Sequence, residues 1–300
     1  MTEAAIPSAH VSAPSLRQAA LAGRAGLLAR HPGVFAPNWR RRGATIATLT
    51  VLALLLVCGF ASLDVSWSRI VRGLGRLGEF ALLMLPPSFG TFDRLELYLL
   101  ALAQTLAIAF LGTLLAALLA LPFGFLAARN VIPNVFAHFV VRRVLDTIRA
   151  VDVLIWALIW INVVGLGPFA GILAIMTSDW GAFGKLFSEA VEAADRRAVD
   201  GIVSTGGSKL HAVRFGLVPQ VLPVFLSQVL YFFESNTRSA TIIGIVGAGG
   251  IGQHFAEQIM VLEWQHVAFL VLLVLVTVAI IDALSSRLRF AIIGAPARAG

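Results

Sequence analysis

The chain contains a series of apolar runs that are long enough to cross a lipid bilayer as helices. A hydrocarbon core of ~30 Å needs roughly 20 apolar residues in a helix, and only helices and closed barrels satisfy their backbone groups in lipid. Six stretches meet this length within tolerance, at 44–63, 97–126, 144–165, 168–187, 217–247 and 264–285. The sequence therefore predicts an all-α integral membrane protein with about six transmembrane helices.

The third and fourth stretches are the least apolar of the six. They contain Asp146, Asp152 and Asp179. Between them, the segment 166–168 reads Leu-Gly-Pro, and glycine and proline interrupt helices. We therefore expect two separate helices here, divided by a tight break.

Composition supports a membrane protein and argues against other classes. Hydrophobic residues make up 58% of the chain and charged residues 13%, whereas soluble domains have about 45–50% and about 25%. Lys and Arg number 23 against 16 Asp and Glu. Because these basic residues flank apolar runs and do not form the basic face of a nucleic-acid binder, we expect no nucleic-acid partner. The single cysteine, Cys58, has no partner for a disulfide within the chain.

The distribution of basic residues predicts the orientation in the membrane. With the N-terminus in the cytoplasm, 18 Lys and Arg fall on the cytoplasmic side and four on the opposite side, while Arg238 lies inside a helix. The positive-inside rule then places both termini in the cytoplasm. Residues 1–43 are expected to form a mobile basic tail and 291–300 a second cytoplasmic tail.

The region 44–95 is expected to hold the first transmembrane helix and a helix that lies flat on the outer surface. From Trp67 to Ala81, apolar residues recur at helical spacing, and Arg69, Arg72, Arg76 and Glu79 fall on the other face. This pattern is typical of a helix in the membrane interface. A soluble amphipathic helix packed on another protein would show the same pattern.

No pattern of catalytic or metal-binding residues stands out. The segment 247–252 matches G-x-G-x-x-G, but it ends an apolar run and follows no predicted strand, so it does not indicate a dinucleotide site. We expect a glycine-rich turn near the outer surface instead, formed by Gly247, Gly249, Gly250 and Gly252. The six histidines lack metal-ligand spacing. The sequence predicts a chain with no catalytic residue, metal or cofactor of its own.

The segment 199–219 carries the most informative motif. Its spacing follows the pattern of an acidic residue and two small residues, three further residues, a glycine, nine residues, an apolar residue, any residue, and then Leu-Pro. This resembles the EAA loop of ABC-importer permeases, with Asp, Gly, Ile, Gly and Val where Glu, Ala, Ala, Ile and Leu are commoner. The resemblance implies that a short helix–turn–helix docks in a groove of a cytoplasmic ATPase subunit. A glycine allows a sharp turn between two short helices, and Pro219 suits the first turn of the following helix. Its motif residues are Asp200, Gly201, Ile202, Gly206, Gly207, Gly216, Val218 and Pro219.

Three further segments, 149–156, 164–171 and 231–252, are similar to the phosphonate-import permease. The resemblance covers about 95–290, so we expect the permease domain at 96–290. It implies an inner-membrane homodimer, two cytoplasmic ATPases that bind ATP and Mg, and a phosphonate-binding protein outside the membrane. The cargo it implies is a phosphonate or a related phosphorus oxyanion such as phosphite.

Polar residues inside the fifth apolar stretch need an explanation, because charges at mid-bilayer usually pair or line a water-filled path. Glu234 and Arg238 are one helical turn apart. They can form an ion pair that only holds helices together, or they can line a path, and both roles are compatible. The candidate translocation-path residues are Asp152, Glu234, Asn236, Arg238, Ser239 and Thr241.

Other functions remain as alternatives. The related methionine-type importer permease has a similar glycine-rich end to its fifth span. A secondary transporter would need internal repeats with broken helices, and a membrane-embedded enzyme would need a nucleophile with a base or a metal-ligand cluster. The sequence indicates neither.

Overall fold

The computed structural model describes residue 26 and residues 39–63, 66–131 and 135–293, and all regular structure in these residues is helical. The predicted all-α fold is confirmed. Most of the predicted tail 1–43 and residues 294–300 of the predicted tail 291–300 lie outside the described residues. The chain divides into two compact units, Met1–Gly75 and Arg76–Gly300, and each is described by itself.

The first unit contains helix α4 (Trp39–Ser62). Its 24 residues would extend ~36 Å at 1.5 Å per residue, and its large apolar side chains are exposed. The predicted helix 44–63 is thus confirmed in position and length. Helix α5 (Trp67–Leu83) crosses the boundary between the units and has no buried residue, and it confirms the helix predicted at 67–81.

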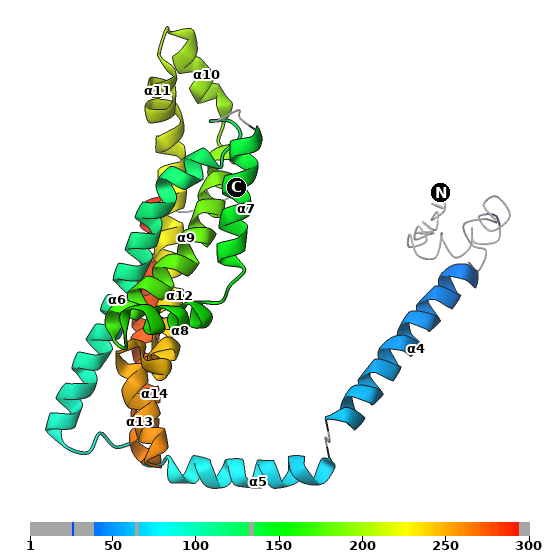
Figure 1. The fold of residues 1–300 in the computed structure, drawn as a ribbon, viewed down its shortest axis with the longest axis vertical. Coiled ribbons are helices and arrows are strands. Elements are labelled where there is room, and N and C mark those ends of the chain that lie inside the picture. The colour runs from blue at the N-terminus through cyan, green and yellow to red at the C-terminus, as the bar shows by residue number, and fades with distance from the viewer. Residues whose placement is uncertain (1–25, 27–38, 64–65, 132–134, 294–300) are drawn as a thin grey trace, which may run out of the picture. The chain divides into compact units, whose positions relative to one another are not determined.

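The second unit is a bundle in which long helices run side by side (Figure 1). Figure 1 also shows a hairpin of short helices, α10 and α11, at one end of the bundle and α13 at the other. The elements of this unit are α6 (Phe92–Leu126), α7 (Val135–Arg149), α8 (Val153–Val164), α9 (Pro168–Ala193), α10 (Arg196–Ser204), α11 (Lys209–His211), the π-helical η1 (Ala212–Leu217), α12 (Val218–Ile243), the π-helical η2 (Gly244–Ala248), α13 (Ile251–Met260) and α14 (Trp264–Ile293).

Within the described residues, four helices are long and apolar enough to cross a membrane: Arg42–Ser62, Phe92–Leu126, Lys209–Ala248 and Trp264–Ile292. A fifth span is added if the bent helix pair His138–Arg149 and Val153–Val164 is counted as a single membrane span. The third predicted span, 144–165, is not one continuous helix, because these two helices meet at 88°. Asp152 explains the break: its carboxylate accepts a hydrogen bond from the Leu154 N–H at 2.8 Å and caps α8.

The predicted fourth span, 168–187, corresponds to α9, which begins at Pro168 as expected from the Leu-Gly-Pro break. Its 26 residues would extend ~39 Å, but it is not among the helices that qualify by apolarity. Asp179 and Lys185 lower the mean hydropathy of α9. Because other helices enclose it, α9 does not need apolar side chains on every side. The predicted number of about six spans is therefore corrected to four or five by length and composition.

Glycines allow the helices of the second unit to pack closely. The nearest atoms to a Cβ built at Gly112 and at Gly124 are the Cβ atoms of Ile175 and Phe187, at 2.7 and 2.8 Å. A Cβ on Gly181 would lie 2.8 Å from backbone atoms of α7. Small residues at helix interfaces let backbones approach in this way, and they place α9 against both α6 and α7.

Aromatic rings fill the core between α9 and α12 towards the α10–α11 end. Phe187 stacks on Phe225 with ring centroids 3.9 Å apart, and Phe183 meets Phe232 at 4.5 Å. These rings belong to one buried cluster that also includes Leu217 from the end of η1. The short helices at this end are thereby fixed to a rigid support.

We predict that Gly181→Ala destabilises the second unit, because the added methyl would meet the Arg149 nitrogen and the Leu145 carbonyl oxygen, which cannot move aside like a flexible side chain. Overpacking of this kind costs about 1–3 kcal/mol, and the thermal midpoint in detergent should fall by about 5 °C. Gly78→Ala is the matched control, since nothing lies within 4 Å of its Cβ position. Equal midpoints for the two variants would contradict this packing.

Candidate functional site

The motif segment 199–219 folds as two short helices joined by a glycine turn. Asp195 caps α10 by accepting from the Arg197 N–H at 2.9 Å. The chain reverses at Gly206, whose φ of +85° lies in the left-handed region that favours glycine. The Gly206 N–H donates to the Val203 carbonyl at 3.0 Å, which closes the end of α10. The predicted arrangement of two short helices around Gly206 is confirmed.

Two other glycines of the motif allow α10 to lie close to the following segment. A Cβ on Gly216 would lie 3.1 Å from the Val199 Cα. A Cβ on Gly207 would lie 2.7 Å from the Ile202 carbonyl oxygen. The glycine at position 216, where the motif usually has an apolar residue, is therefore required by the contact between η1 and α10.

The junction between η1 and α12 contains Pro219, which was expected in the first turn of the helix that follows the motif. Pro219 is in the first turn of α12, but α11, η1 and α12 follow one another without an intervening loop. Pro219 lacks an N–H and would crowd the carbonyl of residue 215 in an α-helix. The wide π turn immediately before it accommodates the proline without ending the helix.

A side-chain amide fixes the base of α10 to α12. The Asp195 N–H donates to Gln220 Oε1 at 3.0 Å, and Gln220 Nε2 donates to the Asp195 carbonyl at 3.1 Å. Movement of α10 is thus linked to the first turn of α12 by two hydrogen bonds. This amide pair joins the segments that precede and follow the glycine turn.

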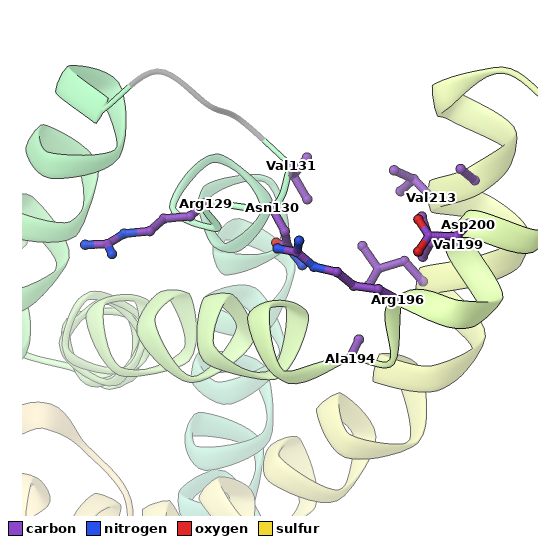
Figure 2. A pocket seen from close by; sticks show the side chains of 10 residues that line it. Arg129, Asn130, Val131, Ala194, Arg196, Val199, Asp200 and Val213 are labelled. Atoms are coloured by element: carbon purple, nitrogen blue, oxygen red, sulfur yellow. The ribbon is translucent and has the colours of Figure 1, made fainter. Parts of the chain in front are cut away.

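A hollow of about 370 Å³ lies beside α10. Figure 2 shows Arg196 and Asp200 projecting around it, whereas the Arg129 side chain points away. Its walls are otherwise mainly aliphatic, so it can accept a side chain that has both a polar end and an apolar stem. The residues that line it are Arg129, Asn130, Val131, Ala194, Arg196, Val199, Asp200, Ala212, Val213 and Leu217.

Arg129 belongs to a polar cluster that ties α7 to α9. Its N–H donates to Glu192 Oε1 at 3.0 Å, and its Nε donates to His138 Nε2 at 3.0 Å. Arg142 adds an ion pair to Glu192 at 3.4 Å. Arg129 and Arg142, which the sequence explained only by orientation, therefore also hold one wall of the hollow in place.

The predicted path residues separate into two groups. Glu234 forms ion pairs with Arg238 at 3.5 Å and with Arg289 of α14 at 3.1 Å. Asn236 points elsewhere: it is buried and its amide donates to Thr113 Oγ1 at 2.8 Å and to the Asp179 carboxylate. The structure does not bring Asn236 together with Glu234 and Arg238.

The other predicted path residues make local bonds. Ser239 and Thr241 donate to carbonyls one turn back in α12, those of Ser235 and Thr237. Asp152 caps α8, as described above. Sequence reasoning missed Arg289, which lies beyond the predicted end of the last span at 285. A usable signal was that nothing between 264 and 289 breaks the helix.

The glycine-rich segment forms the predicted turn. Gly247, Gly249 and Gly250 have φ values of +102°, +80° and +76°. The turn is tied to α6, because the Gly250 N–H donates to Gln104 Oε1 at 3.0 Å and the Ile251 N–H donates to Thr105 Oγ1 at 2.8 Å. Gly252, the fourth predicted member, lies in the first turn of α13.

The described residues contain no group of three or more His, Cys, Asp or Glu that could hold a metal ion. The arrangement can instead bind a partner at the α10–α11 loop, and it holds charges inside a helical bundle.

Known proteins are similar in sequence to this chain over most of its length. A provisionally named phosphite transport system permease protein of Stutzerimonas stutzeri is 37% identical over 84% of this chain and 89% of the relative. The phosphite transport system permease protein of the same organism is 32% identical over the same shares. The phosphate-import permease protein of Mycolicibacterium smegmatis is 36% identical over 69% of this chain but 38% of the relative.

The fold is similar to that of the MetNI methionine ABC transporter in an inward-facing conformation, with a TM-score of 0.60 at 19% identity, over 68% of this chain and 99% of that one. The family model described as binding-protein-dependent transport system inner membrane component matches residues 120–292. On these matches, the chain belongs to the family of inner-membrane components of binding-protein-dependent transport systems, and it is a permease subunit.

Proposed function

We propose that this permease moves phosphite or a phosphonate inward across the inner membrane, driven by ATP hydrolysis on a partner subunit. The observation that supports this cargo is the similarity to two phosphite transport system permease proteins over 84% of the chain. The likeness to the methionine transporter concerns the fold, since its identity is 19%. The methionine alternative therefore has weaker support.

The α10–Gly206–α11 loop is the proposed contact with the ATPase. Its two capped helices and exposed tip give a rigid projection, and Leu210 at the tip is 75% exposed. In this proposal the partner ATPase binds ATP and Mg, and this chain contributes no ligand to them. Movement of the loop passes to α12 through the Gln220–Asp195 bonds.

The proposed assembly contains two permease subunits, two ATPases and a binding protein outside the membrane. The second permease is a second copy of this chain or a related permease chain. Both termini lie in the cytoplasm, and α5 lies in the membrane interface with its apolar face in lipid. The excess of Lys and Arg on the cytoplasmic side supports this orientation.

Reconstituted transport tests the cargo. Proteoliposomes containing the permease, its ATPase and its binding protein should accumulate phosphite or methylphosphonate when ATP is supplied to the side on which the ATPase is bound. Uptake of labelled D-methionine in the same vesicles should stay at the level without ATP. Uptake of methionine without uptake of either phosphorus compound would overturn the proposed cargo.

Gly206→Val should release the ATPase from the permease, because a β-branched residue at φ +85° is strained by about 1–2 kcal/mol and reshapes the turn. Gly165→Val is the matched control. Gly165 has φ +90°, nothing lies within 4 Å of a Cβ at either glycine, and Gly165 follows α8, away from the α10–α11 hairpin (Figure 1). Co-purification in detergent should lose the ATPase in the first variant and retain it in the second. Full retention in both would contradict the assigned contact.

The proposed orientation predicts which sites a membrane-impermeant maleimide reaches in a Cys58→Ser background. Met260→Cys at the end of α13, where the native side chain is 82% exposed, should react in intact spheroplasts. Ser204→Cys in the α10–α11 hairpin should react only after permeabilisation, because it faces the cytoplasm. The reverse pattern would invert the topology.

A further inference from the structure

Glu234 lies between two arginines from different helices. Arg289 of α14 approaches one carboxylate oxygen at 3.1 Å, and Arg238 of α12 approaches the other at 3.5 Å. The Glu234 side chain is 10% exposed. One negative and two positive charges leave this three-residue cluster with a net charge of +1.

The two arginines are not equivalent partners of Glu234. Arg289 donates a hydrogen bond of ordinary length to Glu234 Oε2, and its Cζ lies 5.9 Å from the centroid of the Tyr231 ring. Arg238 approaches at the longer distance, and its side chain is 49% exposed against 24% for Arg289. Arg289 therefore offsets most of the Glu234 charge, and Arg238 keeps most of its own.

Arg238 belongs to an open face that runs along α12 and continues into η2. Val224, Tyr231 and Arg238 of α12 and Ile245 of η2 recur every seven residues and are exposed, so they follow one side of the helix. A guanidinium on such a face is costly in lipid, whereas the side chains at the other three positions tolerate either lipid or water. A charge exposed on the surface of one subunit therefore needs either a water-filled space or a partner chain beside it.

We propose that Arg238 binds the phosphorus oxyanion as it passes through the membrane and that the Glu234–Arg289 pair positions Arg238. This inference rests on the proposed cargo. Guanidinium groups bind oxyanions through paired N–H donors. Without Arg289, the full charge of Glu234 would cancel that of Arg238. With Arg289 present, Glu234 retains only enough attraction to orient Arg238 and to keep the anion from being trapped.

Three variants separate the role of the exposed Arg238 charge from that of the Glu234–Arg289 pair. Arg238→Gln removes the exposed guanidinium and leaves Glu234 paired with Arg289. The double variant Glu234→Gln with Arg289→Gln removes the pair together, leaves no unpaired carboxylate and keeps Arg238. Arg238→Lys keeps a positive charge but not the paired donors. Each is assayed in the complete complex for ATP-driven phosphite and methylphosphonate import and for ATPase activity stimulated by the binding protein.

Arg238→Gln should reduce import at least about tenfold, the loss expected for one charged hydrogen bond, while stimulated ATPase activity persists. Arg238→Lys should recover part of the import, and the double variant, which keeps Arg238 but loses the pair that positions it, should import less than the parent and more than Arg238→Gln. A purely structural arginine would not uncouple ATPase activity from import in this way.

Import by Arg238→Gln at the parental rate would overturn the inference and leave the proposed cargo intact. Loss of complex assembly in Arg238→Gln that Arg238→Lys restores would also overturn it, because Arg238 would then serve as a contact between subunits. If the unmodified complex imports neither phosphite nor methylphosphonate, the proposed cargo fails, and the inference fails with it.

Discussion

The close approach of α9 to its neighbours is the contact on which the second unit depends. In a bilayer the hydrophobic effect does not drive helices together, so packing and hydrogen bonds between helices must do so. Gly181 and Gly184 admit Leu145 of α7, and Gly112 and Gly124 admit α9 against α6. The Asn236 amide then joins α12 to α6 through Thr113 and to α9 through Asp179. This polar contact has a unique geometry, which fixes the register of α12 in the bundle.

The bundle is closely packed next to the α10–α11 hairpin, which is the proposed contact with the ATPase. The Phe183, Phe187 and Phe225 rings pack α9 against α12 directly behind the α10–α11 hairpin. Force applied to the hairpin therefore reaches α12, which also carries Glu234 and Arg238. α11, which belongs to the proposed ATPase contact, lies on the same continuous helix as Glu234 and Arg238, Lys209–Ala248.

Local features were predictable from the sequence, and long-range ones were not. The turn at Gly206 and the start of α9 at Pro168 follow from the backbone preferences of glycine and proline, so both were found. The 88° bend between α7 and α8 was missed because apolar periodicity continues across it, although Asp152 is a good capping residue. Arg289 was missed because its partner, Glu234, is 55 residues away. Asn236 was assigned to a path because a sequence does not reveal which polar groups are buried with partners.

The bent pair α7–α8 has a consequence for how the protein is made. The 12 residues of α8 extend only ~18 Å, which is too short to cross a bilayer of ~30 Å. α7 is charged at Arg142, Arg143, Asp146 and Arg149. We therefore expect that neither helix enters lipid by itself during synthesis. Since α9 packs against both α7 and α8, we expect the three helices to enter the bilayer as a group.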